Sequence, residues 1–129
     1  MSVMTVEQAK WLQSLEGRWL TRWQSLLLTK HDPLANFNSW LEPFRQFTIP
    51  DHNYIWDFAF PAQRILIEVN GGQFMRKSGH SNASKQGRDC RKLCVASAAG
   101  YRQWNWSTDM IDEVVWYEML YSCLKGNPC

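Results

Sequence analysis

The chain has 129 residues, enough for one domain with a real hydrophobic core. Hydrophobic residues make up 45% and aromatic residues 14%, with eight Trp, so the composition argues against a disordered chain. The net charge of +2 gives no global basic field, and any affinity for nucleic acid must come from local patches.

No apolar run approaches the roughly 20 residues of a membrane span, and the polar N-terminus is not typical of a signal peptide. We therefore expect no membrane contact and a cytoplasmic location. In that compartment cysteines stay reduced, which we expect of all four: Cys90, Cys94, Cys123 and Cys129.

The sequence pattern of the N-terminal third predicts helices. Thr5 and Gln8 form a capping box, and apolar residues then follow at helical spacing to about Lys30. These residues are Leu12, Leu15, Trp19, Trp23 and Leu26. A second, shorter helix is predicted over about residues 37–44. The Trp residues of the first helix are predicted to belong to the core.

Residues 54–68, YIWDFAFPAQRILIE, contain two short apolar runs that predict an antiparallel hairpin. Alternation places Asp57 on one face of the first run and Glu68 on one face of the second. Two carboxylates on adjacent strands can converge on one point, where they repel unless a cation lies between them. Hard divalent metals take oxygen ligands, so the pair predicts a metal site. Turn hydrogen bonds at a strand end are the simpler interpretation of Asp57 taken alone.

After the hairpin, the polar and basic residues 75–88 predict a mobile loop. A helix is predicted over about residues 84–99, stopped by Gly100, and a strand over 101–106. A last helix is predicted to start at residues 107–109 and to turn four residues inward: Ile111, Val115, Leu120 and Leu124. We expect a single domain over 1–129, with a helical part over 1–46 and an α/β core over 47–129, in which helices flank a mixed sheet.

Several segments carry a family resemblance: Y-x-x-D-F-A-F-P, I-L-I-E-V-N-G-G, G-H, G-R-D-C-R-K-L and A-G-Y-R. Over about residues 47–106 the chain resembles the small phage and bacterial endonucleases of the PD-(D/E)XK superfamily, on the branch that is similar to very-short-patch repair and Holliday-junction-type nucleases. The resemblance implies a restriction-endonuclease-like αβββαβ core with extra N-terminal helices. It also implies a Mg²⁺- or Mn²⁺-dependent DNA endonuclease in a bacterial or phage-infected cytoplasm, acting on branched, nicked or mismatched DNA. The metal ligands would be Asp57, Glu68 and the backbone carbonyl of Val69.

The chain departs from the family motif at one position. The motif ends in Glu-x-Lys, whereas Asn70 stands at the Lys position and carries no charge. The resemblance implies a lysine on the following helix. Lys92 fits because it shares a helix face with Asp89, and Lys85 is the alternative. The departure also favours a second function class, a non-catalytic relative that binds nucleic acid or protein.

Other candidates surround this site. His80 resembles a position that orients water or contacts the scissile phosphate, although a solvated loop histidine is an equal alternative. For Lys92, the alternative is an exposed lysine on a helix. Glu42 is a candidate additional metal ligand. A local run of basic residues is predicted to contact DNA phosphates, with a solvated loop as the alternative: Arg76, Lys77, Lys85, Arg88 and Arg91. A homodimer would suit symmetric cleavage of a junction.

The cysteines allow two interpretations. Cys90 and Cys94 are four residues apart on one predicted helix and are expected to be small buried apolar residues. The alternative is a structural Zn²⁺ site formed by Cys90, Cys94, Cys123 and His80.

Overall fold

A computed structural model describes residues 3–30, 41–69 and 80–126, with the backbone alone over 80–86. The chain forms two compact units, one of Met1–Ser39 with Thr108–Cys129 and one of Trp40–Ser107. The last segment of the chain therefore groups with the N-terminal helices. No helix in the described ranges is long and apolar enough to cross a membrane.

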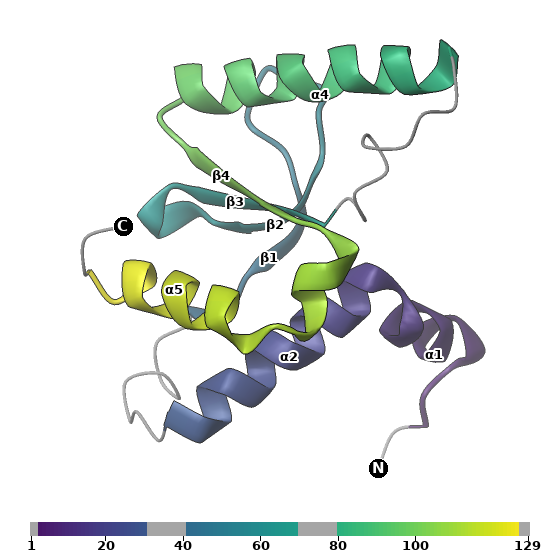
Figure 1. Ribbon diagram of the computed structural model, residues 1–129, viewed down its shortest axis with the longest axis vertical. Coiled ribbons are helices and arrows are strands. Elements are labelled where there is room, and N and C mark those ends of the chain that lie inside the picture. The colour runs from purple at the N-terminus through teal and green to yellow at the C-terminus, as the bar shows by residue number, and fades with distance from the viewer. Residues whose placement is uncertain (1–2, 31–40, 70–79, 127–129) are drawn as a thin grey trace. The chain divides into compact units, whose positions relative to one another are not determined.

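The first unit contains the helices α1 (Val6–Gln13), α2 (Leu15–Lys30) and α5 (Val114–Leu124), with a 3₁₀ turn over Thr108–Asp112 (Figure 1). The capping box at Thr5 is confirmed. The prediction of one continuous helix to Lys30 is wrong, because the backbone of Ser14 is extended and separates α1 from α2. The two helices approach closely at Gly17, where an added Cβ would lie 2.1 Å from the carbonyl oxygen of Trp11.

Aromatic side chains fill the core of this unit. Trp19 and Trp23 are buried, with ring centroids 6.0 Å apart. The hydroxyl of Tyr117 donates to the carbonyl of Ile111 at 2.8 Å, and burial raises the pKa of Tyr117. Ile111, Leu120 and Leu124 are buried as predicted, but Val115 is 50% exposed and the prediction for it is wrong. The helical period explains this, since Val115 lies two residues before Tyr117 and thus on the other side of α5.

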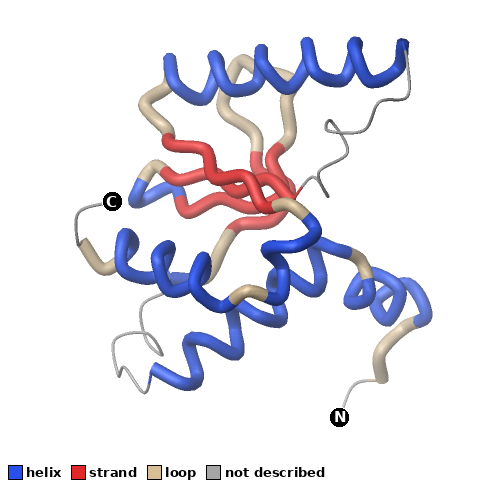
Figure 2. Tube along the Cα trace, in the orientation of Figure 1, coloured by secondary structure: helices blue, strands red, loops and turns tan. Residues whose placement is uncertain are grey.

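The second unit contains a mixed sheet of β1 (Phe44–Phe47), β2 (Trp56–Phe60), β3 (Ile65–Val69) and β4 (Arg102–Trp106), in that order across the sheet. The strands are the red segments of Figure 2. β1 and β3 are antiparallel to β2, whereas β4 is parallel to β3. The predicted hairpin is confirmed: Pro61–Gln63 form a 3₁₀ turn, and Arg64 takes a left-handed conformation with φ 59°. The chain therefore has the mixed α/β class expected from its sequence.

Two boundaries in this unit differ from those predicted. β1 begins at Phe44, where the sequence pattern predicted the end of a helix; residues 37–40 of that helix lie outside the described residues. Pairing with β2 stabilises this edge strand, and a local pattern cannot reveal such a partner. The helix α4 (His80–Ala98) begins at His80, so residues 80–88 of the predicted loop are helical.

The helix α4 runs along one face of the sheet (Figure 1). Ala96 packs there in a cluster with Ala59 and Leu66. The helix ends as predicted at Gly100, which has φ 83°. The N–H of Tyr101 donates to the carbonyl of Ala96 at 2.8 Å, completing a Schellman motif. Ala96 therefore fixes which side of α4 faces the sheet, and Lys92, one helical turn earlier, lies on the same side.

Candidate active site

Asp57 and Glu68 are neighbours on one face of the sheet. The register pairs Phe58 with Ile67, and its continuation by one residue places Asp57 opposite Glu68. The N–H of Val69 donates to Oδ2 of Asp57 at 2.7 Å. The N–H of Asp57 donates to Oε1 of Glu68 at 3.2 Å. Each carboxylate is thus held by the main chain of the neighbouring strand, and the structure brings together the two residues that the hairpin pattern singled out.

Lys92 reaches this pair from α4. Its Nζ lies 2.9 Å from Oε2 of Glu68 and 2.7 Å from the carbonyl oxygen of Ile55. It also lies 5.1 Å from the centroid of the Trp56 ring, within the range of a cation–π interaction. Lys92 is only 8% exposed, so the interpretation as an exposed helix lysine is wrong. Its ammonium group offsets the repulsion between the two carboxylates.

The chemistry of these donors fits a hard divalent cation. Mg²⁺ is usually bound through one or two carboxylates together with substrate phosphates and water. Asp57 and Glu68 supply two carboxylates on a rigid pair of strands, and each ionised carboxylate has about four lone-pair positions. The N–H of Asp57 and the Nζ of Lys92 occupy two positions on Glu68, so capacity for a cation remains on this side chain.

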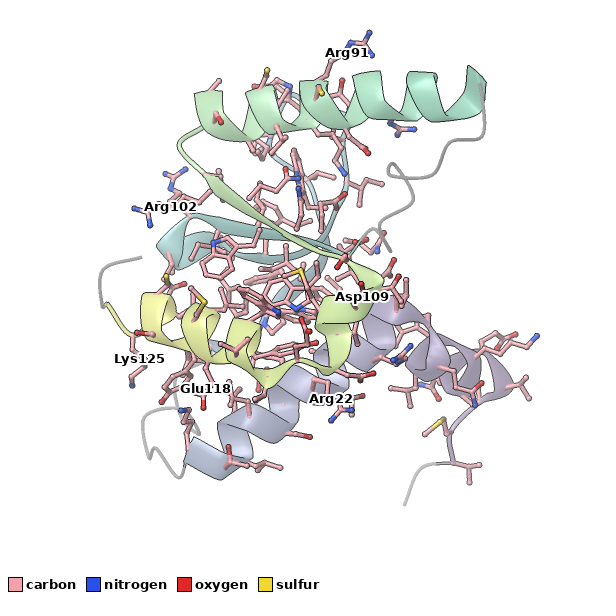
Figure 3. All side chains as sticks on the ribbon, viewed as in Figure 1. Arg22, Arg91, Arg102, Asp109, Glu118 and Lys125 are labelled. Atoms are coloured by element: carbon pink, nitrogen blue, oxygen red, sulfur yellow. The ribbon has the colours of Figure 1, made fainter. Side chains whose placement is uncertain are left out.

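The structure describes the other predicted site residues only in part. His80 is the first residue of α4, and Lys85 lies in α4 two turns before Lys92; their side chains are outside the described part. Arg88 and Arg91 are exposed, and Arg91 points away from the sheet (Figure 3). The remaining predicted residues of this region, Asn70, Arg76 and Lys77, lie outside the described ranges.

Glu42 gains no support as a metal ligand. It is exposed and lies in a bend before β1. Phe44 pairs with Ala59 and Phe47 with Trp56, so the chain before Phe44 continues toward the Pro61 end of β2. Asp57 lies toward the opposite end of that strand.

The cysteine predictions require two corrections. Cys90 and Cys94 are exposed free thiols rather than buried core residues. They lie on the part of α4 that does not face the sheet. The sequence pattern alone did not show which side of this helix would be buried. Cys123 is disulfide-bonded, so the expectation that all four cysteines are reduced is wrong. A sulfur atom in a disulfide cannot serve as a zinc thiolate, which removes Cys123 from the candidate Zn²⁺ site.

Two amides on β4 lie beside the carboxylates and were not predicted. Asn105 is the register partner of Glu68, and Gln103 is the partner of Leu66, so both amides lie on the face that carries the carboxylates. The indole N–H of Trp56 donates to Oε1 of Gln103 at 2.8 Å, and Nε2 of Gln103 donates to Oδ1 of Asn105 at 2.9 Å. A signal was present: in the segment RQWNW, polar and aromatic residues alternate with the period of a strand.

No protein-family model, curated protein or solved structure matches this chain. The residues of the site are therefore the basis on which a function can be proposed.

Proposed function

We propose that this protein is a metal-dependent DNA endonuclease that hydrolyses phosphodiester bonds. The observation that carries the proposal is the buried Lys92, bonded to one of two facing carboxylates at one end of a sheet. A buried ion pair contributes little net stability compared with well-packed apolar side chains. A buried cation beside paired carboxylates can, in contrast, serve hydrolysis of a phosphodiester, because it can stabilise negative charge that develops beside a metal-bound water.

The order of the elements supports a restriction-endonuclease-like core. Among the described elements, α2 precedes β1, β2 and β3 in the sequence, and α4 and β4 come after them. This is the αβββαβ succession that the resemblance to PD-(D/E)XK endonucleases implies. The carboxylates lie on the second and third strands of that succession, and Lys92 lies on the helix that follows them.

Each residue has a role in the proposed reaction. Asp57, Glu68 and the backbone carbonyl of Val69 would hold Mg²⁺ or Mn²⁺, which, when bound, lowers the pKa of a water ligand and neutralises the phosphate. Lys92 takes the place of the lysine that Asn70 replaces in the motif. Its ammonium group has three N–H donors, and the contacts with Ile55 and Glu68 use two. The third can donate to the attacking water or to the phosphate, where negative charge develops.

DNA that is branched, nicked or mismatched is the proposed substrate class, and exposed basic residues such as Arg88 would contact its phosphates. Binding of the backbone by local charges is compatible with a net charge of only +2, since counterion release depends on the phosphates contacted rather than on the total charge.

The test is incubation of the purified chain with supercoiled, nicked, mismatched and four-way-junction DNA in Mg²⁺ or Mn²⁺. We expect cleavage that chelation abolishes and that Asp57→Asn reduces by several orders of magnitude. Asp109→Asn, a change at an exposed aspartate of the 3₁₀ turn before α5, is the matched control and should cleave at the wild-type rate. Binding of these substrates without cleavage by the wild-type protein would instead identify a non-catalytic relative.

A further inference from the structure

A polar row crosses three strands of the sheet at one level. Asp57 on β2 faces Glu68 on β3, and Glu68 is the register partner of Asn105 on β4. In a sheet, such partners lie about 4.8 Å apart and point to the same face. Asn105 is exposed. It is therefore accessible to a ligand that approaches the two carboxylates.

The hydrogen bonds fix the orientation of the Asn105 amide. An indole N–H can only donate, so the Gln103 oxygen must face Trp56, which is completely buried. The NH₂ group of Gln103 then faces Asn105, and this requires the oxygen of Asn105 to face Gln103. One donor-only group in the core thus determines the direction of two amides. The side-chain NH₂ of Asn105 is presented as a donor, and its oxygen is already engaged.

We propose that Asn105 is a further catalytic residue, whose side-chain NH₂ donates a hydrogen bond to a non-bridging oxygen of the scissile phosphate. The inference rests on the proposed function. A neutral donor beside Glu68 can approach a phosphate without adding negative charge to the site. Lys92 and Asn105 would then contact the phosphate from α4 and from β4. A preorganised donor directed at developing negative charge stabilises the transition state.

Gln103 is a positioning residue in this arrangement. It touches no substrate, but its amide decides whether Asn105 presents a donor or an acceptor. Gln103→Glu keeps an acceptor for the indole of Trp56 and removes the donor to Asn105. This substitution preserves the size of the side chain, but the Asn105 amide is no longer held in one orientation.

The first measurement is steady-state cleavage in Mg²⁺. Asn105→Ala is expected to lower kcat by roughly 10²-fold to 10³-fold, the effect of losing one such donor, with KM nearly unchanged. Asn105→Asp should lose at least as much, because an ionised carboxylate cannot donate. Gln103→Glu should lower kcat by a smaller factor. Gln24→Ala, at an exposed position of α2, is the control and should keep the wild-type rate.

Two further measurements separate this role from others. Mn²⁺ affinity from calorimetry should change less than about twofold in Asn105→Ala; a large loss of affinity, with the rate restored at saturating Mn²⁺, would make Asn105 a metal ligand and overturn the proposal. A wild-type rate in Asn105→Ala would also overturn it.

A readout without catalysis distinguishes this inference from the proposed function. NMR of the side-chain amides follows Asn105 while duplex DNA is added in Ca²⁺. We expect a shift of the Asn105 NH₂ signals that is lost in Gln103→Glu. If the wild-type protein cuts no DNA but the shift appears, endonuclease activity is refuted while the phosphate contact stands. If DNA binds and the Asn105 signals do not move, the inference fails whatever the activity.

Discussion

Replacement of Lys92 by Met removes the charge and keeps an unbranched side chain of similar length. In the wild-type structure the Lys92 ammonium group bonds to Glu68 and to the carbonyl of Ile55, and the side chains of the pair are 10% and 15% exposed. Removing one partner of a buried ion pair costs about 3–5 kcal/mol, because the other charge is left unpaired. Glu68 retains the hydrogen bond from the N–H of Asp57, so we expect a value near the lower end, about 3 kcal/mol.

A double-mutant cycle isolates the pairwise contribution. Glu68→Gln combined with Lys92→Met leaves neither member of this ion pair charged, so the double variant should recover about 2 kcal/mol relative to additivity. The assay is urea unfolding in EDTA at constant pH, followed by Trp fluorescence. Lys10→Met, at an exposed position of α1, is the control and should change stability by less than about 0.5 kcal/mol.

The same variant tests catalysis. Corrected for the folded fraction, Lys92→Met should cleave DNA roughly 10²-fold or more slowly. Its affinity for Mn²⁺ should not fall, since the lost charge repelled the cation. A destabilised variant that cuts at the full rate would show that Lys92 only joins α4 to the hairpin. A stable variant with full activity would refute both parts of the argument and move the catalytic role to Lys85.

Three other predictions concern metal, DNA and pH. Asp57→Ala and Glu68→Ala should each lose Mn²⁺ binding in calorimetry; unchanged affinity in both would exclude the metal site. Substitution of three basic residues with Gln should weaken DNA binding and reduce the slope of log K against log salt by about two to three units, and a wild-type slope would mean that DNA approaches another face. These residues are Arg76, Lys77 and Lys85. Burial raises the pKa of Tyr117 above 10.0. The contribution of this group to the free energy of unfolding is therefore fully present below about pH 10 and is lost as the pH rises, because the unfolded chain releases the proton at a lower pH than the folded chain. Tyr117→Phe should reduce that alkaline loss in urea unfolding, and an equal loss in both proteins would contradict the assignment.

The sequence determined the features that depend on neighbouring residues. Alternation with period two and a short turn after Phe60 predicted a hairpin that carries Asp57 and Glu68 on adjacent strands. That both lie on one face depends on the four-residue connection, which pairs Phe60 with Ile65, because a shift of one residue would turn Glu68 to the other face. The capping box at Thr5 and the stop at Gly100 are equally local, since each satisfies the backbone groups of a helix end.

Only the tertiary structure decided the rest. The helical spacing of Lys92 and Asp89 defined a face of α4 but not whether that face meets the sheet, and the packing of Ala96 settled this. The strand β1 depends on pairing with β2. Asn105 became a neighbour of Glu68 only through the parallel register of β3 and β4, which joins residues 37 positions apart in the sequence. Local patterns carry no information on such pairings, because the free energy that selects them comes from contacts between distant segments.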